Sequence, residues 1–171
     1  MDIKSFIEDV PNFPKPGIMF RDISPLLANV EAFGKTVYLI AAAWKGSVDS
    51  VVALDARGFV FGAPVALALG VPLVMIRKKG KLPGKVVCYS YDLEYGFDTV
   101  EMKHDALRVG DRVLVVDDLL ATGGTAAAAC ALVEKVGASV AGCAFVIELD
   151  ALNGRAKLGG VPVQSLLHYG D

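Results

Sequence analysis

The chain has 171 residues, enough for one α/β domain with a full core and too few for two. Its 17 basic and 19 acidic side chains give a net charge of -2, so no overall positive field is available to bind nucleic acid. The three cysteines lack Cys-x-x-Cys spacing and lie among apolar neighbours, which favours buried free thiols in a reducing cytoplasm. We expect one cytoplasmic domain over residues 1–171.

A membrane span and an export signal are both disfavoured. The first ten residues carry mixed charges, which interrupt any apolar signal core. The stretch from Gly58 to Ile76 has no charge, but Pro64, Gly70 and Pro72 break it. This pattern predicts a helix over 59–69 and a strand over 73–76.

Residues 1–28 contain several prolines, which argue against a regular element there. Ile18, Met19 and Phe20 are too apolar for a solvated arm, so the segment should fold back over the rest of the chain. After it, Asn29 is a plausible N-cap for a helix whose apolar residues recur at helical spacing through Trp44.

Charged residues follow the next two predicted strands. Strand 50–54 leads into Asp55-Ala56-Arg57-Gly58, and strand 73–76 leads into a basic run over 77–85. A basic run is usually a solvated loop. This one follows a strand that should open onto the ligand edge of a parallel sheet, where anionic ligands bind.

Two alternating segments, 86–93 and 98–103, predict an antiparallel flap joined by the residues from Glu94 to Phe97. By spacing alone, Glu94 is an ordinary charge at a hairpin tip. The chain ends with a predicted strand over 139–149, a short helix near 154–157 and a strand over 163–167. His104 and His168 lie far apart, and we interpret both as structural.

The most informative stretch runs from Val113 to Thr125. Four apolar residues predict a buried parallel strand, and Asp117 and Asp118 follow it. Two carboxylates there can accept hydrogen bonds from a pair of neighbouring hydroxyls, such as a ribose diol. The turn from Thr122 to Thr125 precedes a helix over 126–135, a typical place for a phosphate. No Gly-x-Gly occurs, which excludes the dinucleotide fingerprint.

This stretch resembles the phosphoribosyl-pyrophosphate motif of the type I phosphoribosyltransferases. Its residue sequence is similar to that of the members that act on adenine. The resemblance covers nearly the whole chain. It implies an α/β fold with about five parallel strands flanked by helices, a small N-terminal hood over 1–28, and a basic loop and antiparallel flap over 77–103.

The resemblance also implies an activity. The chain would transfer 5-phosphoribose from 5-phosphoribosyl-1-pyrophosphate (PRPP) to adenine, giving AMP and pyrophosphate in purine salvage. Mg²⁺ would be held through the substrate without direct protein ligands. A homodimer is implied, and neither nucleic acid nor a membrane is expected as a partner.

Each ligand group is assigned residues by the same resemblance. Asp117 and Asp118 hold the ribose hydroxyls. The 5-phosphate lies on Ala121, Thr122, Gly123, Gly124 and Thr125. Pyrophosphate contacts Arg57, Arg77, Lys78 and Lys81. Adenine contacts the backbone of Met19 and Arg21, with Phe20 and Leu149 on its faces. Glu94, with Arg57, belongs to the catalytic set, and Tyr95 is its neighbour in the flap. Ser90 sits one place earlier than in the simplest form of the family's flap motif.

Two alternatives remain open. Another purine base, such as hypoxanthine, guanine or xanthine, is the nearer one. A non-enzymatic regulator that senses purine or PRPP on the same fold is the other, although only about fifty residues precede the first predicted sheet strand and none forms a recognition helix.

Overall fold

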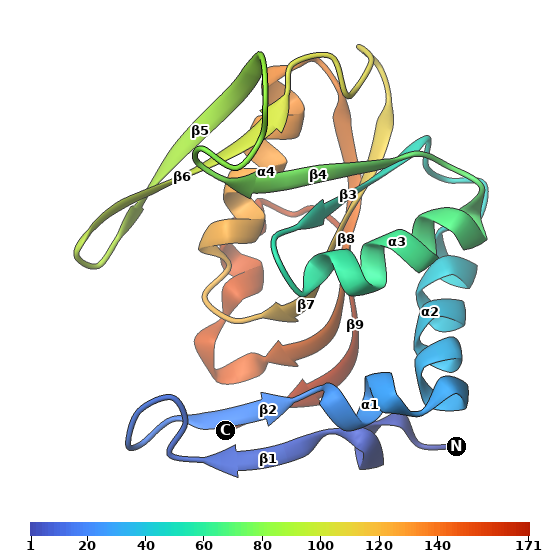
Figure 1. Cartoon of the computed structure of the whole chain (residues 1–171), viewed down its shortest axis with the longest axis vertical. Coiled ribbons are helices and arrows are strands. Elements are labelled where there is room, and N and C mark those ends of the chain that lie inside the picture. The colour runs from blue at the N-terminus through green and yellow to red at the C-terminus, as the bar shows by residue number, and fades with distance from the viewer.

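The computed structural model describes residues 1–171 and contains two sheets. A small one pairs β1 (Glu8–Pro11) with β2 (Met19–Asp22), and the large one has seven strands in the order β5-β6-β4-β3-β7-β8-β9 (Figure 1). The strands of the large sheet are β3 (Ser50–Leu54), β4 (Leu73–Lys78), β5 (Val86–Leu93), β6 (Gly96–Lys103), β7 (Arg112–Leu120), β8 (Ser139–Leu149) and β9 (Val163–Tyr169).

Five of these strands, β4, β3, β7, β8 and β9, are parallel neighbours, as the sequence predicts. The flap strands β5 and β6 are antiparallel and also match the prediction. However, β6 pairs with the end of β4 through Arg77 and Lys78, so the flap extends the main sheet. The sheet therefore has seven strands, and the flap is anchored beside the basic run.

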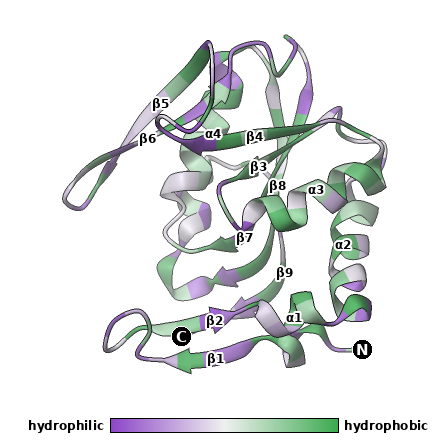
Figure 2. Cartoon of the chain, in the orientation of Figure 1, coloured by the Kyte–Doolittle hydropathy of each residue, from purple (hydrophilic) through white to green (hydrophobic).

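Helices cover both faces of the large sheet. Those that cover it are α2 (Val30–Trp44) and α3 (Gly58–Leu69) on one face and α4 (Gly124–Lys135) on the other. The remaining helices are α1 (Ser24–Ala28) and the 3₁₀ helices η1 (Ile3–Phe6), η2 (Asp150–Leu152) and η3 (Gly154–Leu158). One core cluster packs α4 against residues such as Phe145, and a second packs α2 and α3 around Phe61. The strands between them are largely hydrophobic, whereas β4 turns hydrophilic at its end (Figure 2).

The start of α2 confirms the predicted cap, because the Asn29 side chain accepts a hydrogen bond from the Ala32 amide at 2.9 Å. Gly34, Lys35 and Thr36 form a triplet that also occurs in phosphate-binding loops. Here they lie inside α2, and the buried Thr36 hydroxyl donates to the Ala32 carbonyl at 2.8 Å. This triplet is therefore part of a core-facing helix.

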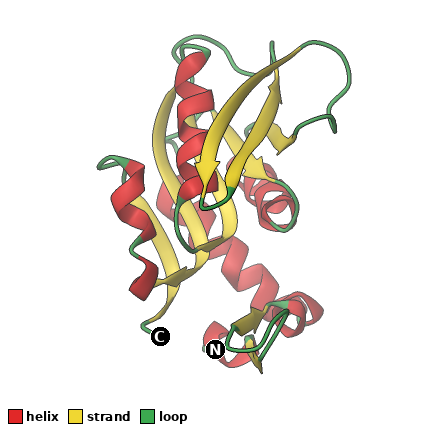
Figure 3. Ribbon diagram, turned by 90° about the vertical axis from the view of Figure 1, so that its left-hand side faces the viewer, coloured by secondary structure: helices red, strands yellow, loops and turns green.

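The N-terminal segment is more regular than predicted. The expectation of an irregular arm is wrong for β1 and β2, which form a hairpin and, with α1 and η1, the hood. Pro11 is tolerated because it lies at the end of an edge strand, while Pro14 and Pro16 fall in the connecting loop. In the turned view of Figure 3 the hood lies below the main sheet.

Two of the three cysteines are buried, as expected. Cys130 and Cys143 face each other in the core with their sulfur atoms 3.6 Å apart. The prediction is wrong for Cys88, which is exposed because it lies on the flap strand β5. No helix in the structure is both long enough and apolar enough to cross a membrane.

Candidate active site

The acidic pair, Asp117 and Asp118, lies where β7 extends beyond the end of its neighbour β3. Pairing between β3 and β7 ends at Val116, but β7 continues to Leu120 because Leu119 and Leu120 still pair with β8. Asp117 and Asp118 therefore lie within the strand, three and two residues before its end. They sit at the carboxyl edge of β3, where open α/β sheets bind ligands.

Asp117 and Asp118 are less solvated than a strand-end position suggests. Asp118 is buried, and its carboxylate accepts a hydrogen bond from Arg57 Nε at 2.7 Å. The Asp117 carboxylate accepts one from the Asp118 amide at 2.8 Å. Burial raises the pKa of Asp117 well above its usual value, the negative charge of Asp118 raises it further, and Arg57 opposes both. The site thus concentrates negative charge beside one arginine.

The turn after β7 forms a cradle at the start of α4. A cavity of about 100 Å³ is lined by Asp117 and by residues 119–126. Gly123 has a φ of +87°, and a Cβ there would lie 2.4 Å from the Gly154 carbonyl oxygen, so only glycine fits. No side chain caps α4, which leaves its first amide groups free for an anion.

The basic residues at the end of β4 and just after it form ion pairs with two acids. Asp55, which follows β3, accepts a hydrogen bond from Arg77 Nε at 3.1 Å and lies 3.9 Å from Lys81 Nζ. The peptide bond between Asp55 and Ala56 is cis. Lys78 forms an ion pair with Asp98 of the flap. Neither acid was predicted from the sequence to take part in the site.

Tyr91 makes further contacts at the site that were not predicted from the sequence. Its hydroxyl lies 3.1 Å from Thr125 Oγ1 and 3.3 Å from both Lys78 Nζ and Asp98 Oδ2. Tyr91 belongs to β5, so the flap touches the phosphate turn directly. The alternation of β5 marks a strand but gives no sign of which hydroxyl reaches α4.

A larger cavity of about 430 Å³ lies between the hood and the body. Its walls include Phe20 and Arg21 of β2, Phe13 and Leu27 of the hood, and Arg57. The Phe13 ring stands edge-on to Phe20, with centroids 5.1 Å apart. The Arg57 guanidinium lies 5.5 Å from the centre of the Phe20 ring while it also binds Asp118. Arg57 therefore connects the hood cavity with the acidic pair.

The remaining predicted residues lie outside this cavity. Met19 is 43% exposed, and Leu149, at the end of β8, packs against the second core cluster. Glu94 and Tyr95 lie at the tip of the flap, which projects away from the body in Figure 1. Tyr95 is 90% exposed. In this structure the flap tip does not approach the other site residues.

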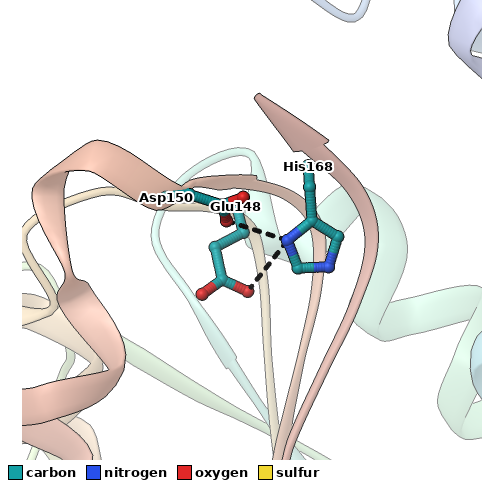
Figure 4. Close-up of side chains that lie close together, drawn as sticks. All are labelled: Glu148, Asp150 and His168. Atoms are coloured by element: carbon teal, nitrogen blue, oxygen red, sulfur yellow. Dashed lines mark hydrogen bonds and ion pairs between the residues drawn. The ribbon is translucent and has the colours of Figure 1, made fainter. Parts of the chain in front are cut away.

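A cluster of possible metal ligands lies at the ends of β8 and β9, where Glu148, Asp150 and His168 place oxygen and nitrogen atoms within 4.8 Å of one another (Figure 4). However, Arg155 donates to both oxygens of Glu148, at 2.7 and 2.8 Å. His168 Nδ1 lies 2.8 Å from Asp150 Oδ1. These contacts account for the cluster as an ion-pair network.

Comparisons with known proteins agree with this geometry. A family profile described as phosphoribosyl transferase domain matches residues 28–158. The chain is 55% identical to the adenine phosphoribosyltransferase of Methylococcus capsulatus over 168 residues, 98% of each chain. It is 54% identical to that of Carboxydothermus hydrogenoformans over 173 residues, 99% of this chain and 100% of the relative.

Solved structures give the same result. The adenine phosphoribosyltransferase of Thermoanaerobacter pseudethanolicus superposes with a TM-score of 0.94 at 48% identity, covering 98% of both chains. That of Saccharomyces cerevisiae, in complex with an imino-altritol bisphosphate and adenine, superposes with a TM-score of 0.90 at 44% identity, covering 96% of both.

Proposed function

Since this chain belongs to the adenine phosphoribosyltransferases of the phosphoribosyl transferase family, we propose that its acidic pair, phosphate turn and hood cavity together perform the transfer of 5-phosphoribose from PRPP to adenine. The products are AMP and pyrophosphate, as purine salvage requires. The main support for this assignment of residues is the position of Arg57. It binds Asp118 of the acidic pair and also lines the hood cavity, so the two parts of the site are adjacent.

We assign the ribose 5-phosphate half of PRPP to β7 and α4. Asp117 and Asp118 accept hydrogen bonds from the ribose hydroxyls, and the turn from Ala121 to Thr125 binds the 5-phosphate. The support is the small cavity that these residues share and the uncapped start of α4.

We assign the pyrophosphate to the basic groups at the same edge. Arg57, Arg77, Lys78 and Lys81 currently lie beside Asp118, Asp55 and Asp98. As the bond to the anomeric carbon breaks, negative charge grows on the leaving group. Cations already fixed at that edge stabilise this charge with little reorganisation. Arginine suits the role because its guanidinium binds phosphate oxygens in pairs.

Mg²⁺ fits this edge as a substrate-bound ion. Oxygen atoms are its preferred donors, and the carboxylates of Asp55, Asp117 and Asp118 lie around the pyrophosphate position. When bound, Mg²⁺ supplies partial neutralisation of the pyrophosphate charge. The protein residues orient the donor and keep it at the carboxyl edge of the sheet.

We assign adenine to the hood cavity, with Phe20 on one face and the backbone of Met19 and Arg21 at the edge of the base. Pro11 has no amide hydrogen, so its pair with Met19 cannot exchange two hydrogen bonds. Hydrogen-bonded and open pairs alternate along such a hairpin, and Met19 and Arg21 fall at open positions. Their backbone groups can therefore meet the amino group and ring nitrogen of adenine.

We assign the final closing step to the flap. Adenine loses a proton as N9 attacks the anomeric carbon, and Glu94 accepts or relays that proton when the flap closes. Closure also excludes water. This requires the tip to move toward the cavity, since Glu94 and Tyr95 are exposed in the present structure.

We propose that the chain works as a homodimer. An apolar groove of about 490 Å³ lies between α2 and α3, and exposed Tyr38 borders it. Sedimentation equilibrium tests the dimer, and a monomer at all concentrations would overturn it.

The activity is tested by measuring pyrophosphate release with adenine, hypoxanthine, guanine, xanthine and uracil. A site that pairs with the 6-amino group leaves a buried acceptor facing an oxygen when a 6-oxo base binds, which can cost about 10⁴-fold. Adenine should therefore dominate. Comparable turnover with hypoxanthine or guanine would reassign the base, and PRPP binding without turnover on any base would favour a regulator.

A further inference from the structure

The segment Tyr169–Asp171, which we call the clamp segment, lies directly against the hood. β9 runs down to the hood hairpin and places this segment beside β2 (Figure 1). Asp171 Oδ1 accepts a hydrogen bond from Arg21 Nη2 at 2.6 Å. The Arg21 guanidinium also lies 4.1 Å from the centre of the Tyr169 ring.

The contact differs from an ordinary surface ion pair on the arginine side, because the Arg21 side chain is only 6% exposed, whereas the Asp171 side chain is 71% exposed. Burial alone lowers the pKa of Arg21, but hydrogen bonds to Asp9 and Asp171 more than compensate, and the pKa is raised overall. Asp9 Oδ1 accepts from Nη1, also at 2.6 Å. The guanidinium is thus held from two sides, by the hood through Asp9 and by β9 through Asp171.

Tyr169 strengthens the same junction. It is 8% exposed, and Lys4 of the hood lies with Nζ 4.4 Å from the ring centre and 3.2 Å from the His168 carbonyl oxygen. Two cations of the hood therefore lie over one aromatic ring of the body. Such contacts strengthen when the groups are desolvated.

The alternation of side chains along β2 relates the contacts of Arg21 to the hood cavity. Successive side chains of a strand point to opposite faces. Arg21 points toward Tyr169, so Phe20 points the other way, toward Phe13 and Arg57. Fixing the Arg21 side chain therefore fixes the orientation of the Phe20 ring and of the backbone on either side of it.

We propose that Tyr169 and Asp171 are positioning residues for adenine, which hold β2 in the orientation that the hood needs to bind the base. The inference rests on the proposed adenine site. It assigns a part in substrate recognition to residues that do not line the cavity. Because the clamp segment contacts neither the phosphate turn nor the basic run, its effect should fall on adenine and spare PRPP.

The test compares Tyr169→Leu and Asp171→Asn with Tyr169→Phe. Tyr169→Leu should raise the KM for adenine about tenfold, the size of one desolvated cation–aromatic contact, and leave the KM for PRPP unchanged. Asp171→Asn should act in the same direction but more weakly, because the Asp171 side chain is 71% exposed. Tyr169→Phe keeps the ring and should behave like the parent. Asp49→Asn is the matched control, because it removes a surface ion pair with Arg112 far along the chain from the hood.

Hydrogen exchange provides a readout that does not depend on activity. Amides of residues 8–22 should exchange faster in Tyr169→Leu and Asp171→Asn than in the parent and the control. Unchanged hood exchange, or an unchanged adenine KM with faster exchange, would overturn the proposal. A parallel rise of both KM values with a lower melting temperature would indicate only a general loss of stability and would also overturn it. If the parent itself fails to use adenine, the proposed function fails, and hood exchange still tests the clamp.

Discussion

Asp117 and Asp118 are adjacent in sequence, yet their surroundings differ. Asp118 is buried and paired with Arg57 at 2.7 Å, so its charge is compensated within the chain. Asp117 receives one backbone hydrogen bond, and its pKa is raised first by burial and then by the negative Asp118. Only Asp117 therefore carries a charge that the folded chain disfavours. Such groups concentrate at functional sites.

Asp117→Asn should lower activity without lowering stability. A carboxyl whose pKa is raised by folding binds its proton more tightly in the folded state. Ionisation of Asp117 therefore destabilises the fold as pH rises above 3.8, the pKa of this group in the unfolded chain. Asparagine keeps the acceptor oxygen and removes the charge. We expect kcat/KM for PRPP to fall about 10²-fold, with a melting temperature at pH 7 equal to or above that of the parent.

Asp118→Asn provides the comparison, because it weakens a charge-assisted bond to Arg57 and should not raise the melting temperature. Near pH 3.5 the melting temperatures of the parent and Asp117→Asn should converge. Activity near the parent value in both variants would contradict the ribose assignment.

Glu94→Gln tests the proton step. The substitution keeps the shape of the side chain and removes its basicity, so kcat should fall about 10² to 10⁴-fold while the KM for adenine changes little. Tyr95→Ala separates this role from shielding. If the flap only excludes water, Glu94→Gln is nearly silent and Tyr95→Ala reduces the rate. Single-turnover measurements of both variants distinguish the two cases.

At the scale of elements, Tyr91 of the flap and the 5-phosphate should compete for the Thr125 hydroxyl. Tyr91 of β5 contacts Thr125, a residue that the 5-phosphate is proposed to use. The same tyrosine contacts Lys78 and Asp98, so the flap is fastened to the basic run as well. Phosphate binding in the turn should therefore loosen the flap at the moment when the flap must move.

Tyr91→Phe should consequently bind PRPP more tightly. Removing one competing hydrogen bond of about 1 kcal/mol predicts a Kd about fivefold lower, measurable by calorimetry. Tyr89→Phe is the matched control, because Tyr89 lies two residues away on the same strand and is exposed. Weaker binding by Tyr91→Phe would mean that the hydroxyl contacts the phosphate itself.

The sequence predicts most elements because their signals are local. The buried strand β8 and the Asn29 cap match the predictions closely, since periodicity and capping act over a few residues. The hood hairpin was missed because proline content argues against strands in general but not against an edge. The contacts of Tyr91 and of Gly154 join segments more than thirty residues apart, and no local pattern encodes them.

At the scale of the whole molecule, the end of β8 holds η3 against the phosphate turn. Glu148, at the end of β8, holds Arg155 of η3, and the neighbouring Gly154 packs against Gly123 of the phosphate turn. A charge at the sheet edge thereby helps to keep η3 against the turn. Glu148 is only 4% exposed, whereas the Arg155 side chain is 45% exposed, so the ion pair is shielded from solvent on the Glu148 side.

Glu148→Gln should make stability depend less on pH. Hydrogen bonds from Arg155 hold the pKa of Glu148 below its ordinary value of 4.5, although burial opposes them. A carboxylate whose pKa is lowered by folding stabilises the fold at pH values above its pKa in the unfolded chain. This contribution is lost as pH falls through its pKa in the folded state. At pH 7 the variant should be less stable by about 1.5 to 3 kcal/mol, the range for hydrogen bonds to charged groups.

Urea unfolding of the parent and Glu148→Gln from pH 7 down to pH 3 measures this difference directly. The two stabilities should converge as pH falls below 4.5 and through the lowered pKa of folded Glu148, because the parent then carries a neutral Glu148 and has lost the charged contact that the variant never had. Glu134→Gln, an exposed change on α4, should track the parent throughout. A difference that stays constant with pH would show that Glu148 stabilises η3 by packing, and the support beneath the phosphate turn would not be electrostatic.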